Sequence, residues 1–168
     1  GGDNFDECWS IDIVATMVDG NYSDDNNNLG MHPLAEDGYN VCASTDISCD
    51  YSDVIEPQNG FDTGIKFYFP HTEWSEDIPE GFSTTDIARD IREFHEINSF
   101  GDAEVWDAVI KTSDITKPIT LDFNTVNEQS ILAGSSRIFV IKDDIWNNVT
   151  DTKQFSFDPS FEESALKI

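Results

Sequence analysis

The stretch Trp9–Val18, WSIDIVATMV, alternates apolar and polar side chains with a period of two. Such alternation is typical of a β-strand that has one face in the core and the other in solvent. The residues expected to face the core are Trp9, Ile11, Ile13, Ala15 and Met17. The residues expected on the outer face are Ser10, Asp12 and Thr16.

The rest of the chain holds further short segments of this kind, separated by turns. Strands with their alternate apolar residues inward are expected at 64–69, 104–111 and 118–124, and further strands are expected at 137–142 and 154–157. The segment 137–142 is apolar on both faces, which predicts a central strand. The segment 84–94 fits a helix or a strand, and we favour a strand because its neighbours are strands. The sequence predicts a single all-β domain over 1–168, an antiparallel β-sandwich of seven to eight strands, Ig-like or jelly-roll-like.

The balance of charge is strongly acidic, with 34 acids against 9 bases and a net charge of -25. Such a surface repels nucleic acid and anionic membranes. No apolar run approaches the roughly 20 residues that cross a bilayer. We expect an extracellular or cell-surface protein whose signal peptide has been removed, with no nucleic-acid partner and no membrane insertion.

The segment 19–56 is rich in Asp, Asn and Gly and lacks a strand pattern, so we expect a long acidic loop ordered by bound cations. Calcium binds six to eight oxygen ligands from carboxylates, amides and carbonyls. The first candidate ligands are Asp24, Asp25, Asn26, Asn28, Asp37 and Asn40. Those that either complete this site or form a second one are Asp46, Asp50, Asp53 and Glu56. The alternative interpretation is a solvated turn without a metal.

The three cysteines cannot all pair within one chain. Cys42 and Cys49 lie seven residues apart in the acidic loop, and we favour a disulfide between them. Cys8 is the alternative partner for either of them, so the connectivity stays open.

Two further kinds of site are suggested by short patterns. Asn21 and Asn148 each begin an Asn-x-Ser/Thr triplet, the acceptor pattern for N-glycosylation. Trp74 and Trp146 stand among polar neighbours, so they are the candidates for exposed aromatic rings that stack on a ligand such as a sugar. The alternative for any aromatic residue in a β protein is packing in the core.

A series of landmarks resembles a secreted β-sandwich domain found in bacterial cell-surface and exported multidomain proteins. The landmarks are Trp9, the Asn-rich segment Asp25–Gly30, the turn Ala35–Tyr39, Glu56-Pro57, Tyr68–His71, Trp74, Asp90-Ile91-Arg92 and Leu121-Asp122-Phe123. Asn40 stands where the domain usually has Asp, and the segment 41–53 with its two cysteines looks like an insertion. The resemblance implies an extracellular, noncatalytic module.

The sequence carries no catalytic motif, and His32, His71 and His95 are scattered. We therefore expect a noncatalytic structural or adhesive subunit of a cell-surface assembly or filament, stabilised by calcium. It would associate with further copies or with other surface proteins. The C-terminal strand pattern suits exchange with a neighbouring subunit, although it equally suits its own sheet. The alternative function is a calcium-dependent carbohydrate-binding module, and a hydrolase is the third.

Overall fold

The structure of this 168-residue chain is a computed structural model. It describes residues 9–19, 22–32, 35, 37–39, 53–55, 64–78, 85–93, 104–126 and 137–168. No helix in this described part is long and apolar enough to cross a membrane.

The described residues form eleven strands and one short 3₁₀ helix. In chain order they are β1 (Trp9–Met17), β2 (Tyr22–His32), β3 (Val54–Ile55), β4 (Ile65–Pro70), η2 (Thr72–Trp74), β5 (Asp86–Glu93), β6 (Asp107–Thr112), β7 (Ile119–Val126), β8 (Phe139–Lys142), β9 (Ile145–Asn148), β10 (Gln154–Phe157) and β11 (Glu163–Lys167). The all-β prediction is confirmed, and so is the choice of a strand for 84–94.

The alternating apolar residues build the core, as their spacing predicts. All five inward residues of β1 are buried, with Ile13 and Ala15 fully so. The same holds for the alternate residues of β4, β6 and β7, which are Ile65, Phe67, Phe69, Ala108, Ile110, Ile119, Leu121 and Phe123. These side chains share one cluster, so the strands wrap around a single core.

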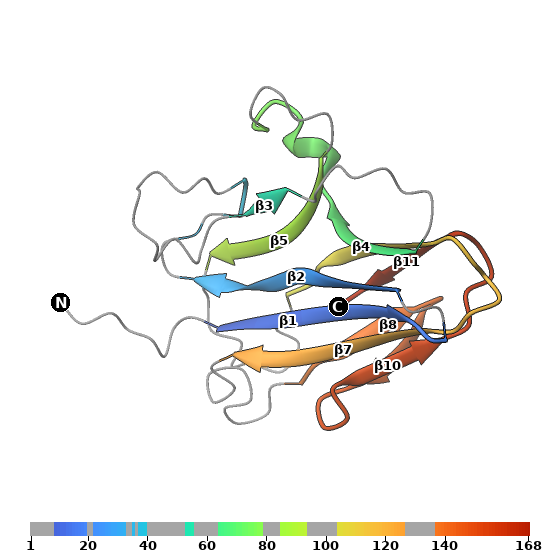
Figure 1. Cartoon of the computed structure of the whole chain (residues 1–168). Coiled ribbons are helices and arrows are strands. Elements are labelled where there is room, and N and C mark those ends of the chain that lie inside the picture. The colour runs from blue at the N-terminus through green and yellow to red at the C-terminus, as the bar shows by residue number, and fades with distance from the viewer. Residues whose placement is uncertain are drawn as a thin grey trace.

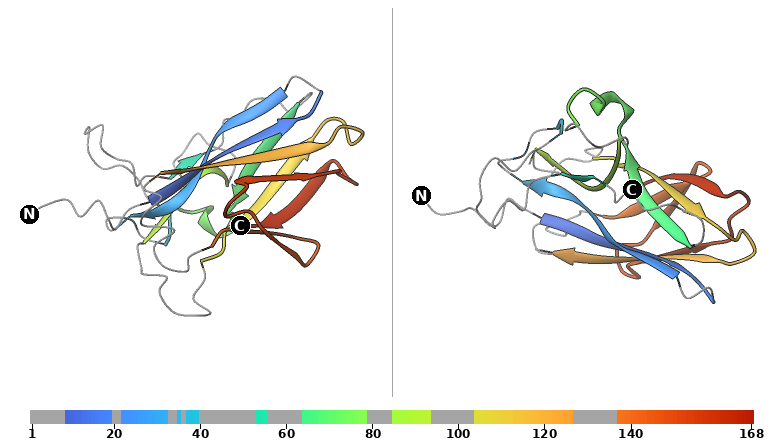
Figure 2. Two further views of the ribbon diagram at one scale, coloured as in Figure 1. Left: turned by 90° about the horizontal axis from the view of Figure 1, so that it is seen from below. Right: turned by 45° about the horizontal axis from the view of Figure 1, so that its top comes forward.

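The strands form one continuous sheet in the order β10-β7-β1-β2-β5-β4-β6-β11-β8-β9, with β3 paired to β5 (Figure 1). The sheet is mixed, because β2 and β5 run parallel while the other pairs are antiparallel. It curls until it nearly closes into a barrel (Figure 2). The ammonium group of Lys142 on β8 lies 4.9 Å from the ring centroid of Phe157 on β10, between the two ends of the sheet. The predicted antiparallel sandwich is therefore not confirmed.

Strand β2 corrects the prediction of a long loop over 19–56. The inward residues of its first half include Asp24 and Asn27, so this half lacks the apolar alternation that marks the other strands, whereas Leu29 and Met31 are buried in its second half. A β-bulge adds to this irregularity. Between the pairs Ile13–Asn27 and Ala15–Asp24, two residues of β2 lie opposite the single residue Val14.

The C-terminal third departs from expectation in two places. Strand β8 lies next to the end of the sheet, not at its centre, and strand β9 falls outside the segments in which strands were expected. The β8–β9 hairpin turns at Asp143 and Asp144, whose φ angles of 53° and 62° suit a two-residue type I′ turn. Strand β11 pairs with β6 and β8 within its own sheet, which is the second of the two arrangements expected for the C-terminus.

The sheet turns its corner at β4. Residues 65–68 of β4 pair with β6, whereas Phe69 and Pro70 pair with β5. Strand β5 in turn pairs with β2 only from Asn28 to His32, so the first half of β2 has no ladder with β4. Asp24 fills this gap, because its Oδ2 accepts a hydrogen bond from the backbone N–H of Phe67 at 2.7 Å. The buried N–H group thereby obtains the acceptor that it needs.

We predict that Asp24→Ala lowers the free energy of unfolding by about 1–3 kcal/mol, because it leaves the N–H of Phe67 unsatisfied. Burial raises the pKa of Asp24, more than its hydrogen bonds lower it. Asp24→Asn keeps an acceptor oxygen without a buried charge, and we expect it to cost less than Asp24→Ala. Urea unfolding measures both.

The neighbouring Asp25→Ala is the matched control, since Asp25 is exposed, and we expect a change of about 0.5 kcal/mol or less. Equal losses for Asp24→Ala and Asp25→Ala would show that the bond to Phe67 does not stabilise the fold.

Candidate functional site

The predicted calcium ligands are divided among separate places. Asp24 points to β4, while Asp25, Asn26 and Asn28 line the outer face of the sheet. Asn40, Asp46, Asp50 and Glu56 lie outside the described residues.

The remaining two predicted ligands lie beside β5, and their carboxylates accept hydrogen bonds from its backbone. Asp53 is buried and accepts a hydrogen bond from the N–H of Ile91 at 2.8 Å. Asp37 is exposed, and its Oδ1 lies 3.3 Å from the N–H of Glu93. Within the described ranges, no group of three or more His, Cys, Asp or Glu side chains is placed to hold a metal ion.

The other predicted sites have mixed outcomes. Cys42, Cys49 and Asn21 lie outside the described residues. The expectation of an exposed Trp74 is wrong: this side chain is 5% exposed, and its ring stacks on the imidazole of His71 with centroids 3.7 Å apart. Trp146 is exposed, at 65%.

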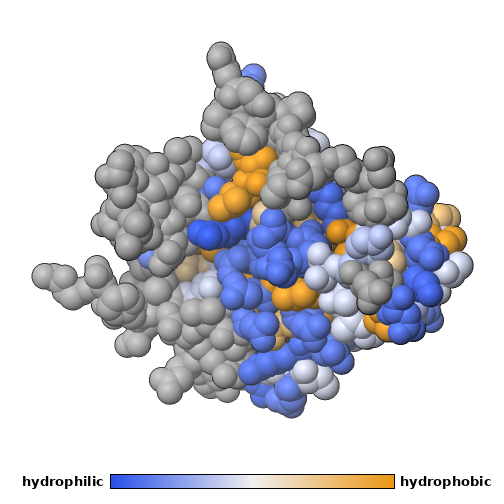
Figure 3. All heavy atoms as spheres, in the orientation of Figure 1, coloured by the Kyte–Doolittle hydropathy of each residue, from blue (hydrophilic) through white to orange (hydrophobic). Residues whose placement is uncertain are grey.

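A polar groove of about 580 Å³ runs over the outer face of β7, β1, β2 and β5. Its lining consists of Ser10, Asp12, Val14, Asp25, Asn26, Asn27, Asn28, Arg89 and Asn124. Figure 3 shows this face as mainly hydrophilic.

Strand register builds the centre of this groove. Asn124, Asp12, Asn28 and Arg89 are direct neighbours across four successive strands, from β7 to β5. Because side chains alternate between faces along a strand, residues paired in register project on the same side. The side-chain amide of Asn28 donates to Oδ1 of Asp12, which fixes the middle of the row.

The β-bulge of β2 completes the groove. The extra residue changes the side to which the chain points, so Asp24 faces inward while Asp25 and Asn26 are exposed. The groove therefore combines two carboxylates, several amides, one hydroxyl and the guanidinium of Arg89. These groups offer many donors and acceptors in an open, shallow site.

A second polar cluster lies at the end of the core and is largely buried. The ring of His71 is held between two carboxylates, with Nδ1 2.6 Å from Oε1 of Glu73 and Nε2 2.6 Å from Oδ2 of Asp90. Asp90 is 1% exposed. Both ring nitrogens face acceptors, and this arrangement favours the imidazolium form.

Arg92 extends the cluster toward β6. Its Nη1 donates to Oε1 of Glu104 at 2.6 Å and to the carbonyl of Val105 at 2.7 Å, and its Nη2 lies 3.6 Å from Oδ2 of Asp90. The guanidinium also lies over the ring of Trp106, 4.6 Å from its centroid. The cluster joins the end of β4 to β5 and to the segment leading into β6.

The sequence did not identify the whole groove. It placed Ser10 and Asp12 on the outer face of β1, but it could not pair them with Asn124 or Arg89, because strand register is not visible in a single sequence. Four of the predicted calcium ligands come from the Asn-rich segment 24–28, and three of them, Asp25, Asn26 and Asn28, line the groove together with Asn27.

Comparisons of the chain with protein-family models, with curated proteins and with solved structures found no match.

We predict that the His71 cluster makes stability fall as pH rises above neutral. Burial lowers the pKa of His71, but the hydrogen bonds and charges of Asp90 and then Glu73 outweigh it, so the pKa is raised overall. A raised pKa gives stabilisation that is complete below the unfolded pKa of about 6.5 and is lost as pH rises through the folded pKa. The loss is about 1.4 kcal/mol for each unit of the shift.

Urea unfolding between pH 5 and 9 measures this dependence, and His71→Gln should remove it. His32→Gln is the control and should retain it. Parallel stability curves for the wild type and His71→Gln would contradict the prediction.

Proposed function

We propose that the protein is a noncatalytic, extracellular adhesive module that binds a carbohydrate in the polar groove. The observation that carries this proposal is the row of side chains from Asn124 to Arg89, with Asp25 and Asn26 beside it. Carboxylates, amides and a guanidinium at adjacent positions match the alternating donors and acceptors of sugar hydroxyl groups.

The charges in the groove and on the whole chain limit the class of ligand that the groove can bind. The groove holds two carboxylates and one guanidinium on a chain of net charge -25, which disfavours polyanionic ligands. A neutral, hydroxyl-rich ligand forms hydrogen bonds with the polar groups of the groove without adding negative charge. The described lining of the groove contains no histidine, and we assign binding and not turnover to the groove.

We predict that Asn28→Ala and Arg89→Ala each weaken saccharide binding by about tenfold or more. Each removes hydrogen bonds to the ligand, and a bond involving a charged group contributes about 1.5–3 kcal/mol. A glycan array identifies a bound saccharide, and isothermal titration calorimetry then gives the dissociation constants.

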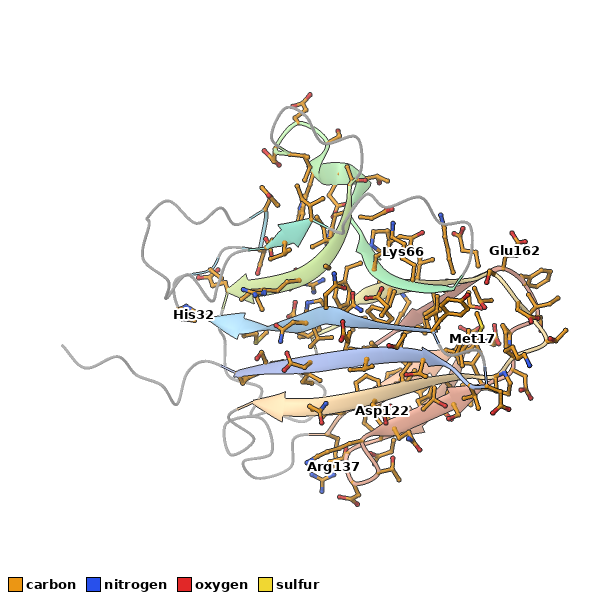
Figure 4. The ribbon with its side chains drawn as sticks, in the orientation of Figure 1. Met17, His32, Lys66, Asp122, Arg137 and Glu162 are labelled. Carbon is orange, nitrogen blue, oxygen red and sulfur yellow. The ribbon has the colours of Figure 1, made fainter. Side chains whose placement is uncertain are left out.

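Asp122→Asn is the matched control. Asp122 lies on the same face of β7 as Asn124 (Figure 4), accepts a hydrogen bond from the side-chain amide of Gln154 and does not line the groove. The proposal fails if no saccharide binds, or if the two groove variants bind as tightly as Asp122→Asn.

The proposal includes calcium, which the sequence of 19–56 supports through its density of oxygen ligands. If calcium binds the folded chain, it stabilises that chain by mass action. Bound calcium would stabilise the fold by on the order of 1–3 kcal/mol. Excess chelator should then lower the melting temperature by several degrees relative to 1 mM calcium. Magnesium in place of calcium is the control, and an unchanged melting temperature would remove calcium from the proposal.

Self-association is a second candidate function, and the position of β9 favours it. This strand ends the sheet order, so one edge of its backbone has no partner strand among the described residues. Ile145 and Trp146 on it are 64% and 65% exposed. An exposed apolar edge strand can pair with a further copy of the chain. Light scattering during the chelator titration would detect such species and their dependence on calcium.

A further inference from the structure

The outer face of the β8–β9 hairpin carries an exposed aromatic surface. Trp146 and Asn148 are two residues apart on β9, so they project to the same face. Trp146 is 65% exposed, and its ring meets Phe139 edge-on with centroids 5.7 Å apart. Phe139 is also the register partner of Asn148 across the hairpin. Both aromatic rings therefore lie on the same face of the hairpin as the side chain of Asn148.

Asn148 also begins the triplet Asn148-Val149-Thr150. It is exposed, and its Oδ1 accepts a hydrogen bond from the N–H of Thr150 at 3.0 Å. This bond uses the amide oxygen, not the nitrogen that would carry a glycan. The neighbouring Asn147 differs, because its Nδ2 donates to the carbonyls of Val140 and Ile145, each at 3.2 Å.

We propose that Asn148 is N-glycosylated and that the first sugar of the glycan packs on the exposed ring of Trp146. In the modification, Nδ2 of Asn148 attacks the anomeric carbon of an oligosaccharide carried on a lipid pyrophosphate. The new C–N bond forms as the C–O bond to the pyrophosphate breaks, the lipid pyrophosphate leaves with the electron pair, and the nitrogen loses one proton. This proposal does not depend on the function of the groove.

Stacking accounts for the exposure of Trp146. A tryptophan ring left in water keeps a large apolar area hydrated, and covering it is favourable by roughly 25 cal/mol per Å². A sugar presents C–H groups on one face and hydroxyl groups around its edge, so it can cover an indole and stay hydrated. A glycan on Asn148 is tethered beside the ring, which removes most of the entropic cost of bringing the two together.

Tryptophan fluorescence tests the contact without any substitution in the hairpin. The chain has four tryptophans, and Trp9, Trp74 and Trp106 are at most 9% exposed. Emission that a small quencher can reach therefore comes from Trp146. Acrylamide is the suitable quencher, because it is neutral and is not repelled by a chain of net charge -25.

For this test, the variant Asn21→Asp is expressed in a eukaryotic cell line and collected as a secreted protein. This variant keeps a single Asn-x-Ser/Thr triplet, the one that begins at Asn148. Glycopeptide mass spectrometry should find Asn148 occupied. Removing the glycan with an amidase that converts the linked asparagine to aspartate should increase acrylamide quenching about twofold. It should also lower the melting temperature by about 2–4 °C.

Two variants complete the experiment. Asn148→Asp keeps the oxygen that accepts from Thr150 and should match the deglycosylated protein in quenching and melting temperature. In Trp146→Ala, glycan removal should change the melting temperature by less than about 1 °C. An unoccupied Asn148, or equal quenching with and without the glycan, overturns the proposal. So does a glycan-dependent melting shift that Trp146→Ala leaves intact.

Discussion

The sheet of this protein stays continuous because strand β4 changes partners along its length. Its first residues pair with β6 and its last two pair with β5, so the sheet turns and encloses a single core. The change leaves the N–H of Phe67 facing the first half of β2, where the carboxylate of Asp24 accepts its hydrogen bond. One buried hydrogen bond therefore substitutes for a missing section of backbone ladder.

The β-bulge of β2 links this closure to the groove on the other side of the sheet. The extra residue of the bulge interrupts the alternation of side chains between the two faces. Asp24 therefore points to the inner side, toward β4, while Asp25 and Asn26 are exposed on the outer side. A regular strand would not give this combination in consecutive residues. The same local irregularity thus closes the sheet and shapes the groove.

Charge is arranged differently inside and outside this sheet. At the end of the core, His71 and Arg92 lie between carboxylates, and an aromatic ring covers each of these two side chains. On the outer face, Arg89 is the only base among the described residues of the groove, which is otherwise lined by acids, amides, one serine and one valine. The hairpin that carries Trp146 lies at the β9 end of the sheet order, and none of its residues lines the groove.

The sequence alone determined the strands whose inner residues are apolar. The alternation in β1, β4, β6 and β7 fixed their type and their buried faces, because burial of apolar area depends on the period of two. Only the tertiary structure decided β2, its parallel pairing with β5, the burial of Trp74 and the row from Asn124 to Arg89. In the first half of β2 the inward positions include Asp24 and Asn27, so the apolar signal is missing there, whereas Leu29 and Met31 are buried in the second half. Asp24 accepts a hydrogen bond from Phe67, which lies 43 residues further along the chain, and the register that brings the two together arises only when the sheet closes.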